Sequence, residues 1–250
     1  MTLSISELST ILQLAASSPN EAKALIKLLS IDVVKALGEN RYLIQTASKD
    51  LTAHSEQKLQ EGSRYWAELT AKQNSTPTLS KLIQHPAIMK ELQQLPVMFD
   101  LKELHKILSH EKPLESIKTK LLEHLSHASS KEDFTQISNL LLSFMNNTLT
   151  IPLQYQQYFG LFQMKKRYNK TTKRSQLDFY AALHDLGPIS GSVMLIQNDI
   201  SVNLSVVFKT TKLFLEENLN DIRYKTTIRL QEDIQPLYNL QTNKILDISA

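Results

Sequence analysis

Residues 193–208 read VMLIQNDISVNLSVVF, and this stretch sets the fold of the C-terminal part of the chain. From residue 200 onward apolar and small polar residues alternate, which is typical of an antiparallel strand with one buried face. The apolar positions are Ile200, Val202, Leu204, Val206 and Phe208, and the polar positions between them are Ser201, Asn203 and Ser205. Asn198-Asp199 precedes the alternation and tolerates positive φ, so the stretch predicts a β-hairpin.

The segments on either side of this hairpin extend the sheet. Residues 177–183 alternate in the same way, and Gly187-Pro188 with Gly191 provides a turn before the hairpin. Residues 210–222 have the apolar spacing of a helix that packs back onto the hairpin. Residues 224–230 fit either a strand or a continuation of that helix, and 244–249 fit a closing strand. We therefore expect an antiparallel sheet with one packed helix over residues 149–250.

A run of cations lies just upstream of this hairpin. Six basic residues occur between positions 165 and 174 with no acid among them: Lys165, Lys166, Arg167, Lys170, Lys173 and Arg174. The run is predicted to span the end of one strand, a turn at Asn169-Lys170 and the start of the next strand. At a hairpin tip it would attract an acidic protein, a phosphate backbone or an anionic membrane. A solvated loop kept basic for solubility is the alternative. Because Tyr168 is the only aromatic residue inside the run, an acidic protein surface is favoured over single-stranded nucleic acid.

The rest of the chain predicts two further regions. Residues 5–29 have the spacing of two short helices, and four strand-like segments at 33–37, 42–46, 51–54 and 65–69 suggest a small barrel-like module over 1–75. Residues 76–148 carry four runs of helical spacing, punctuated by Pro86, Pro96 and Pro113. The predicted fold class is α+β: N-terminal helices with a small β module, a helical middle, and the C-terminal sheet.

The composition argues against most enzyme and cofactor classes. The chain has 250 residues, no cysteine and five glycines, and it contains no GxGxxG, GxxxxGK[ST], GxSxG or HExxH pattern. His124 and His127 are spaced to share a helix face, but no further ligands accompany them. We expect no enzyme activity, no cofactor, no metal and no small-molecule substrate. A net charge of +3 disfavours a general nucleic-acid footprint. No apolar window is long enough to span a bilayer, and no signal peptide is evident.

The order of segments at the C-terminus resembles that of a known family. The segments are Leu177-Asp178-Phe179, Asp185-Leu186-Gly187-Pro188-Ile189, Gly191-Ser192-Val193-Met194-Leu195, Ile200-Ser201-Val202-Asn203-Leu204 and Leu215-Glu216-Glu217-Asn218-Leu219. Over about 75 residues they resemble the C-terminal domain of flagellar hook-length control proteins. There an aliphatic strand is followed by a leucine-glycine turn, two antiparallel strands and a helix.

The resemblance implies a binding role in the flagellar or a related type III export apparatus. The partner would be the cytoplasmic domain of the export-switch protein, with a change of substrate specificity or of hook length as the outcome. The residues expected at the contact are the six cations with Gly187 and Pro188. The chain has only eight prolines and a helical middle in place of a disordered Pro- and Gln-rich ruler. A structural or motor-associated flagellar protein without ruler activity is therefore an open alternative. The expected location is the cytoplasm, at the flagellar base, or outside the cell after export without a cleavable signal.

Overall fold

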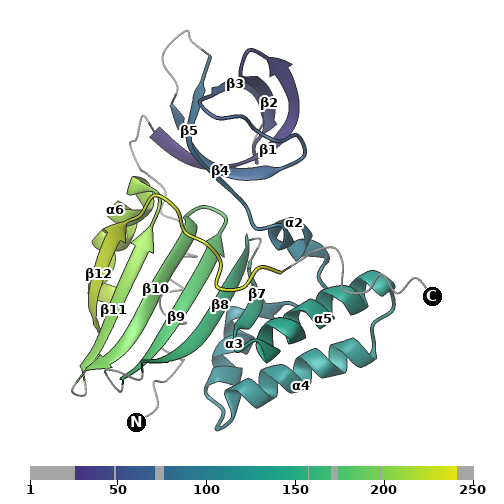
Figure 1. The fold of residues 1–250 in the computed structure, drawn as a ribbon, viewed down its shortest axis with the longest axis vertical. Helices are drawn as coiled ribbons and strands as arrows, with labels where there is room; N and C mark the ends of the chain where they lie inside the picture. Colours follow the sequence, from purple (N-terminus) through teal and green to yellow (C-terminus); the bar gives the residue numbers. More distant parts are fainter. Residues whose placement is uncertain are drawn as a thin grey trace.

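The computed structural model describes residues 26–47, 49–70, 76–156, 158–169, 174–196 and 199–240. Its described part consists of a closed β-barrel, a seven-stranded sheet and a group of helices beside that sheet (Figure 1). The barrel strands are β1 (Ile26–Gly38), β2 (Arg41–Gln45), β3 (Asp50–Ser55), β4 (Arg64–Thr70) and β5 (Thr78–Gln84).

The barrel closes because β1 is long and bent enough to pair with two neighbours. It pairs antiparallel with β4 along its first half and with β2 along its second half, and the register shifts twice beside β2. Strand β5 pairs antiparallel with β4 and parallel with β3, so the order around the barrel is β1-β2-β3-β5-β4. This is a five-stranded Greek-key barrel of the OB type. Its interior holds Ile31, Val33, Ile44, Ala53 and Leu79, each at most 1% exposed.

The large sheet has the order β12-β11-β10-β9-β8-β7-β6. Its strands are β6 (Phe99–Asp100), β7 (Leu149–Tyr155), β8 (Tyr158–Asn169), β9 (Arg174–Leu183), β10 (Gly187–Ile196), β11 (Asp199–Val206) and β12 (Lys225–Leu230). The hairpins from β7 to β11 are antiparallel, whereas β6 and β12 join the two edges in parallel. The hairpin predicted around Asn198-Asp199 is therefore confirmed as β10–β11, with Val193 opposite Val202.

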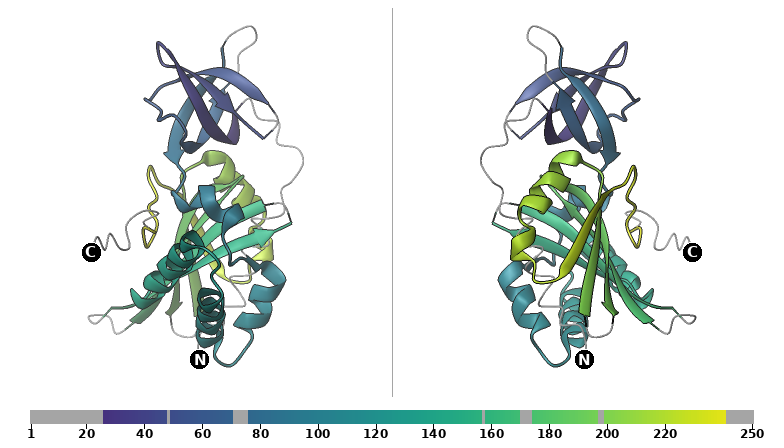
Figure 2. Two further views of the ribbon diagram at one scale, coloured as in Figure 1. Left: turned by 90° about the vertical axis from the view of Figure 1, so that its right-hand side faces the viewer. Right: turned by 90° about the vertical axis from the view of Figure 1, so that its left-hand side faces the viewer.

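The helices lie beside and behind this sheet. They are α2 (Ile88–Glu91), the 3₁₀ turn η1 (Leu92–Gln94), α3 (Leu101–Leu108), α4 (Pro113–Ser126), α5 (Lys131–Met145), α6 (Lys209–Glu217) and η2 (Leu219–Asp221). Local chemistry starts several of them: the Asp100 carboxylate caps α3, Pro113 opens α4, and the Ser130 hydroxyl caps α5. Figure 2 shows α6 on one side of the sheet and the C-terminal segment 231–240 crossing the other side.

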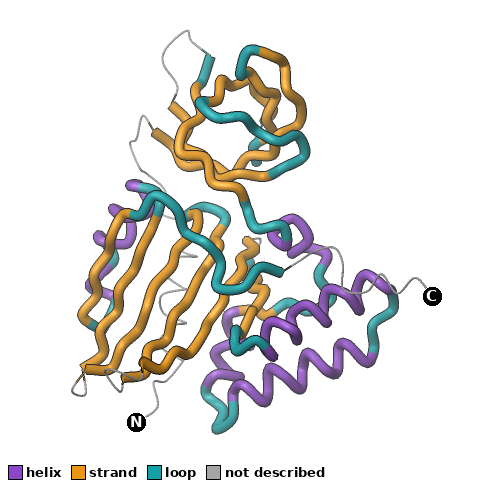
Figure 3. The backbone as a smooth tube through the Cα atoms, viewed as in Figure 1, coloured by secondary structure: helices purple, strands orange, loops and turns teal. Residues whose placement is uncertain are grey.

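The predicted fold class is wrong, because the described chain is mostly β, with 46% strand and 27% helix (Figure 3). The first expected N-terminal helix lies outside the described residues, and the second is replaced from residue 26 by β1. Residues 79–83, expected to start a helix, lie in β5. Helices α3 to α5 form where helical spacing occurs, but they are no separate helical region, because β6 before them and β7 after them pair in one sheet. Pairing with strands that are distant in sequence therefore determines the secondary structure of these segments.

Both bodies meet at Trp66 of β4, which is fully buried. Its indole Nε1 donates to the main-chain carbonyls of Leu183 (3.0 Å) and His184 (3.1 Å), at the end of β9. The ring belongs to the core of the large sheet and stacks on His85 at 3.7 Å between ring centroids. The barrel is therefore attached to the sheet by a side chain from its own wall.

Candidate functional site

The two faces of the large sheet differ in chemistry. One face, the apolar face, carries Phe179, Ile189, Val202 and Leu204, all buried, and α6 packs against it. The opposite face, the polar face, carries Ser192, Ser201 and Asn203 on β10 and β11, each of them partly exposed. Among the described residues, segment 231–240 crosses the polar face at its barrel end (Figure 1). The basic residues lie at the other end of the sheet.

The predicted basic hairpin is formed by β8 and β9, with Asn169 paired to Arg174. Lys166 and Arg167 are exposed, Lys165 is half-buried, and the side chain of Tyr168 is 60% exposed. Since successive strand residues alternate between faces, Lys165 and Arg167 lie on the polar face. Arg174 starts β9, while Lys170 and Lys173 lie outside the described residues. The structure thus brings three of the six predicted cations onto one strand end, next to an exposed tyrosine.

One acid lies within this basic group. Asp178 of β9 is opposite Lys165, and its carboxylate is 2.5 Å from Nε of Arg167, while the Gln176 amide donates to it at 2.5 Å. The Asp178 side chain is 11% exposed and that of Arg167 is 62% exposed. The carboxylate therefore pairs with the guanidinium on the polar face, whereas Lys165 and Lys166 form no ion pair with another described residue. Such an arrangement attracts an acidic surface.

Gly187 and Pro188 are not brought together with these cations. Both are buried at the start of β10, where they pair with Leu183 and Ala182 at the far end of β9 from Arg174. Gly187 has φ +76°, and a Cβ there would come within 2.6 Å of the Phe208 ring. Gly187 therefore shapes the core around Phe208, and both Gly187 and Pro188 are buried.

The barrel has the strand order of oligonucleotide-binding barrels, but its described residues present no exposed aromatic ring. Its aromatic residues, Tyr42, Tyr65 and Trp66, are all buried, so none can stack on a base. The hydroxyls of Tyr42 and Tyr65 instead accept hydrogen bonds from the backbone amides of Leu59 and Gln60, which fixes the loop before β4.

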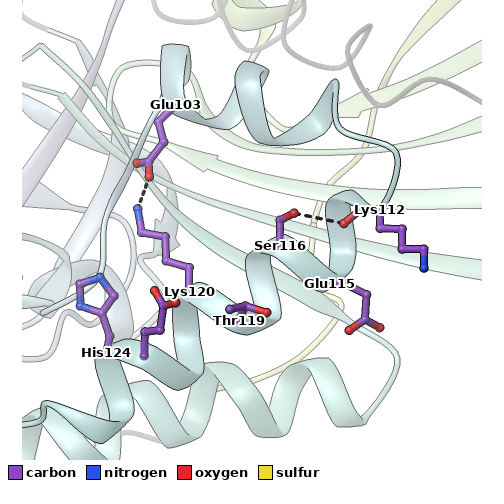
Figure 4. Close-up of a pocket in the computed structure, with 8 residues that line it drawn as sticks. Glu103, Lys112, Glu115, Ser116, Thr119, Lys120 and His124 are labelled. Carbon is purple, nitrogen blue, oxygen red and sulfur yellow. Dashed lines mark hydrogen bonds and ion pairs between the residues drawn. The ribbon is translucent and has the colours of Figure 1, made fainter.

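A surface pocket of about 590 Å³ lies between α3 and α4 (Figure 4). Glu103 and Lys120 form an ion pair across it, and the Lys120 ammonium also lies 4.5 Å from the centre of the Phe99 ring. The Ser116 hydroxyl donates to the carbonyl of Lys112, in the same helix. The ion pair and this hydrogen bond thus join residues that line the pocket.

The histidines are spread over the fold. His124 lines the pocket, whereas the ring Nδ1 of His127 is 2.7 Å from the carbonyl of Glu123 in its own helix. Within the described ranges, no three His, Asp or Glu side chains lie close enough together to hold a metal ion. His85 and its partner Trp66, which sequence reasoning missed, are buried at the junction of barrel and sheet. The one available signal was that Trp66 is the only tryptophan.

Two buried titratable groups carry shifted pKa values. Burial, together with the smaller effect of the nearby charges of Arg64 and His184, lowers the pKa of His85 to about 2. Burial also raises the pKa of the Tyr180 hydroxyl well above its ordinary value, with a smaller contribution from Asp233. Both groups are therefore neutral at physiological pH. The Ser30 hydroxyl lies 3.3 Å from Nε2 of His85.

None of the helices in the described part of the chain is long and apolar enough to cross a membrane. Comparison of the chain with protein-family models, with curated proteins and with solved structures found no match.

Proposed function

We propose that this chain is a non-enzymatic docking protein of the flagellar or a related type III export apparatus. Its C-terminal sheet would bind the cytoplasmic domain of the export-switch protein and so influence substrate specificity or hook length. The observation that carries the docking role is the basic end of β8, where Arg167 is exposed on the polar face and Lys166 and Tyr168 are exposed on the opposite face. Arginine and tyrosine are enriched at the centres of protein interfaces, and the cations favour an acidic partner.

The order of elements supports the assignment to an export apparatus. Strand β9, the Leu186-Gly187 turn, strands β10 and β11, and helix α6 follow one another as the resemblance to hook-length control proteins implies. Helix α6 begins three residues after β11 ends, and it packs on β11 and β12. This order is an argument about fold, so the partner has to be established by binding.

The test is binding of the purified chain to the cytoplasmic domain of the export-switch protein, measured by calorimetry. The variant K165Q/K166Q should weaken binding by at least tenfold, because it removes two positive charges and places no acid opposite Asp178. The matched control K106Q/K118Q neutralises two exposed lysines of α3 and α4 and should bind like the wild type. Absence of binding by the folded wild type, with normal hook lengths in a strain lacking the gene, would refute the proposal.

An anionic surface or a nucleic acid is the second candidate for the same cations, and salt separates it from the first. Affinity for DNA should fall steeply with salt, because each neutralised phosphate releases counterions. A docked protein partner that also buries Tyr168 should retain much of its affinity at high salt. Binding to DNA with a steep salt slope, together with no binding to the switch domain, would favour the second candidate.

A further inference from the structure

The described sheet ends at β12, and this edge has backbone groups available for pairing. Strand β12 pairs with β11 alone, in parallel, with Thr226 beside Val202 and Leu230 beside Val206. Within the described ranges, no backbone hydrogen bond from another segment reaches the outer side of β12. A free edge of this kind is a template on which an extended chain can add as a further strand.

The direction of the available groups follows from one hydrogen bond. The amide of Gln231, just after β12, donates to the carbonyl of Val206 at 2.9 Å. Because successive residues of a strand point their backbone groups to opposite sides, Lys225, Thr227 and Arg229 also point toward β11. The N–H and C=O groups of Thr226, Ile228 and Leu230 consequently point outward. Three residues are thus ready to pair with an incoming strand.

The side chains along this edge define what the incoming strand should carry. Lys225 and Arg229 lie on the polar face, both are exposed, and neither forms an ion pair within the described part of the chain. Ile228 and Leu230 lie on the apolar face, and Leu230 is 48% exposed. An added strand would therefore place acidic side chains beside the two cations and apolar side chains beside Leu230.

The same charges argue against a second copy of β12 as the occupant. If two copies of β12 paired antiparallel about Thr227, Lys225 of each would face Arg229 of the other. Like charges directly opposite one another destabilise a strand pair. The edge of β12 therefore favours an incoming strand with acidic side chains over a second copy of β12.

We propose that β12 is a strand-addition site for an extended segment of a partner protein in which acidic and apolar residues alternate. The inference rests on the proposed docking role and names the chemistry of the partner at an edge separate from the basic hairpin. Backbone pairing would supply binding along the strand, and Lys225 and Arg229 would select the acidic sequence.

The probe is an eight-residue peptide of alternating valine and aspartate with blocked ends, titrated into the full-length ¹⁵N-labelled chain. The matched control peptide has lysine at every aspartate position. We expect amide shifts confined to β12 and its neighbours, slower hydrogen exchange at Thr226 and Leu230, and no response to the lysine peptide. Absence of shifts at millimolar aspartate peptide, or equal shifts with both peptides, would overturn the proposal.

Substitutions of the two cations and of Thr226 distinguish the contribution of the charges to binding from that of backbone pairing. K225E/R229E should bind the lysine peptide in preference to the aspartate peptide, changing the ratio of affinities by roughly tenfold or more, because each cross-strand charge pair changes sign. T226P removes an outward N–H and should abolish binding, whereas T226V keeps that N–H and should bind normally. Retention of binding by T226P with an unchanged spectrum elsewhere would exclude strand addition.

The peptide assay does not involve the switch protein, so the two proposals fail separately. Binding of the switch domain without peptide binding leaves the docking role intact and overturns the edge site. Peptide binding without binding of the switch domain supports the edge site and removes the proposed partner.

Discussion

At the residue scale, two glycines with similar backbone conformation should differ in how they tolerate alanine. Gly187 and Gly62 have φ of +76° and +70°, but a Cβ would meet the Phe208 ring only at Gly187, since nothing lies within 4 Å at Gly62. G62A should cost about 1 kcal/mol from the left-handed conformation alone. G187A should cost roughly 3 kcal/mol, because overpacking adds to that strain. Urea unfolding of both variants measures the difference, and equal losses would mean that Phe208 moves aside freely.

His85 makes stability depend on pH. The folded chain holds the His85 ring neutral with a pKa of about 2, whereas an unfolded chain protonates it near its ordinary pKa of 6.5. The unfolded state thus binds more protons below pH 6.5, and the contribution of His85 to stability is complete above that pH. It should fall by about 1.4 kcal/mol per pH unit as the pH drops further.

The pH dependence is checked by measuring the free energy of unfolding between pH 7 and pH 4. H85Q should flatten the slope by about one proton. An identical slope in H85Q and wild type would show that His85 gains a proton without leaving its site.

At the element scale, a buried glutamine ties the C-terminal segment to the sheet. Gln163 of β8 is fully buried, and its amide donates to the carbonyl of Tyr238 (2.7 Å) while its carbonyl accepts from the Tyr238 amide (3.1 Å). Q163L should cost about 2 kcal/mol, because both backbone groups of Tyr238 lose their partner. It should also raise hydrogen exchange at Tyr238 selectively. Q154L, at a half-buried position, should change stability by less than about 0.5 kcal/mol.

The element scale also shows what the sequence could predict. The alternation from Ile200 to Val206 identified β11 because one face of that strand is buried and the other is open, so its sequence records both environments. Residues 224–230 were ambiguous, since β12 becomes a strand by pairing with β11 rather than through a pattern of its own. The segment around Leu79 has helical spacing but pairs with β4 and β3 instead. Pairing with strands distant in sequence overrides the local secondary-structure propensity of such segments.

The candidate site was predictable only in part, for a related reason. The run of basic residues can be identified directly in the sequence. Its placement on a hairpin followed from the predicted turn at Asn169-Lys170. Burial cannot be read in that way, so Gly187 and Pro188 were grouped with surface residues. The junction at Trp66 and His85 joins residues that the barrel and the sheet bring together, with Leu183 more than a hundred positions away. No local pattern marks such a contact.

At the scale of the whole molecule, Trp66 decides whether barrel and sheet unfold as one body. Its ring fills the core of the sheet from the wall of the barrel, and its Nε1 is bonded to the end of β9. W66A removes the hydrogen bonds and leaves a cavity, so we expect a loss of roughly 3–5 kcal/mol and two separate calorimetric transitions in place of one. W66F keeps most of the ring volume and should lower stability by less while preserving the single transition. A single transition in W66A would mean that other contacts suffice to couple the two bodies, and two transitions in the wild type would mean that Trp66 does not couple them.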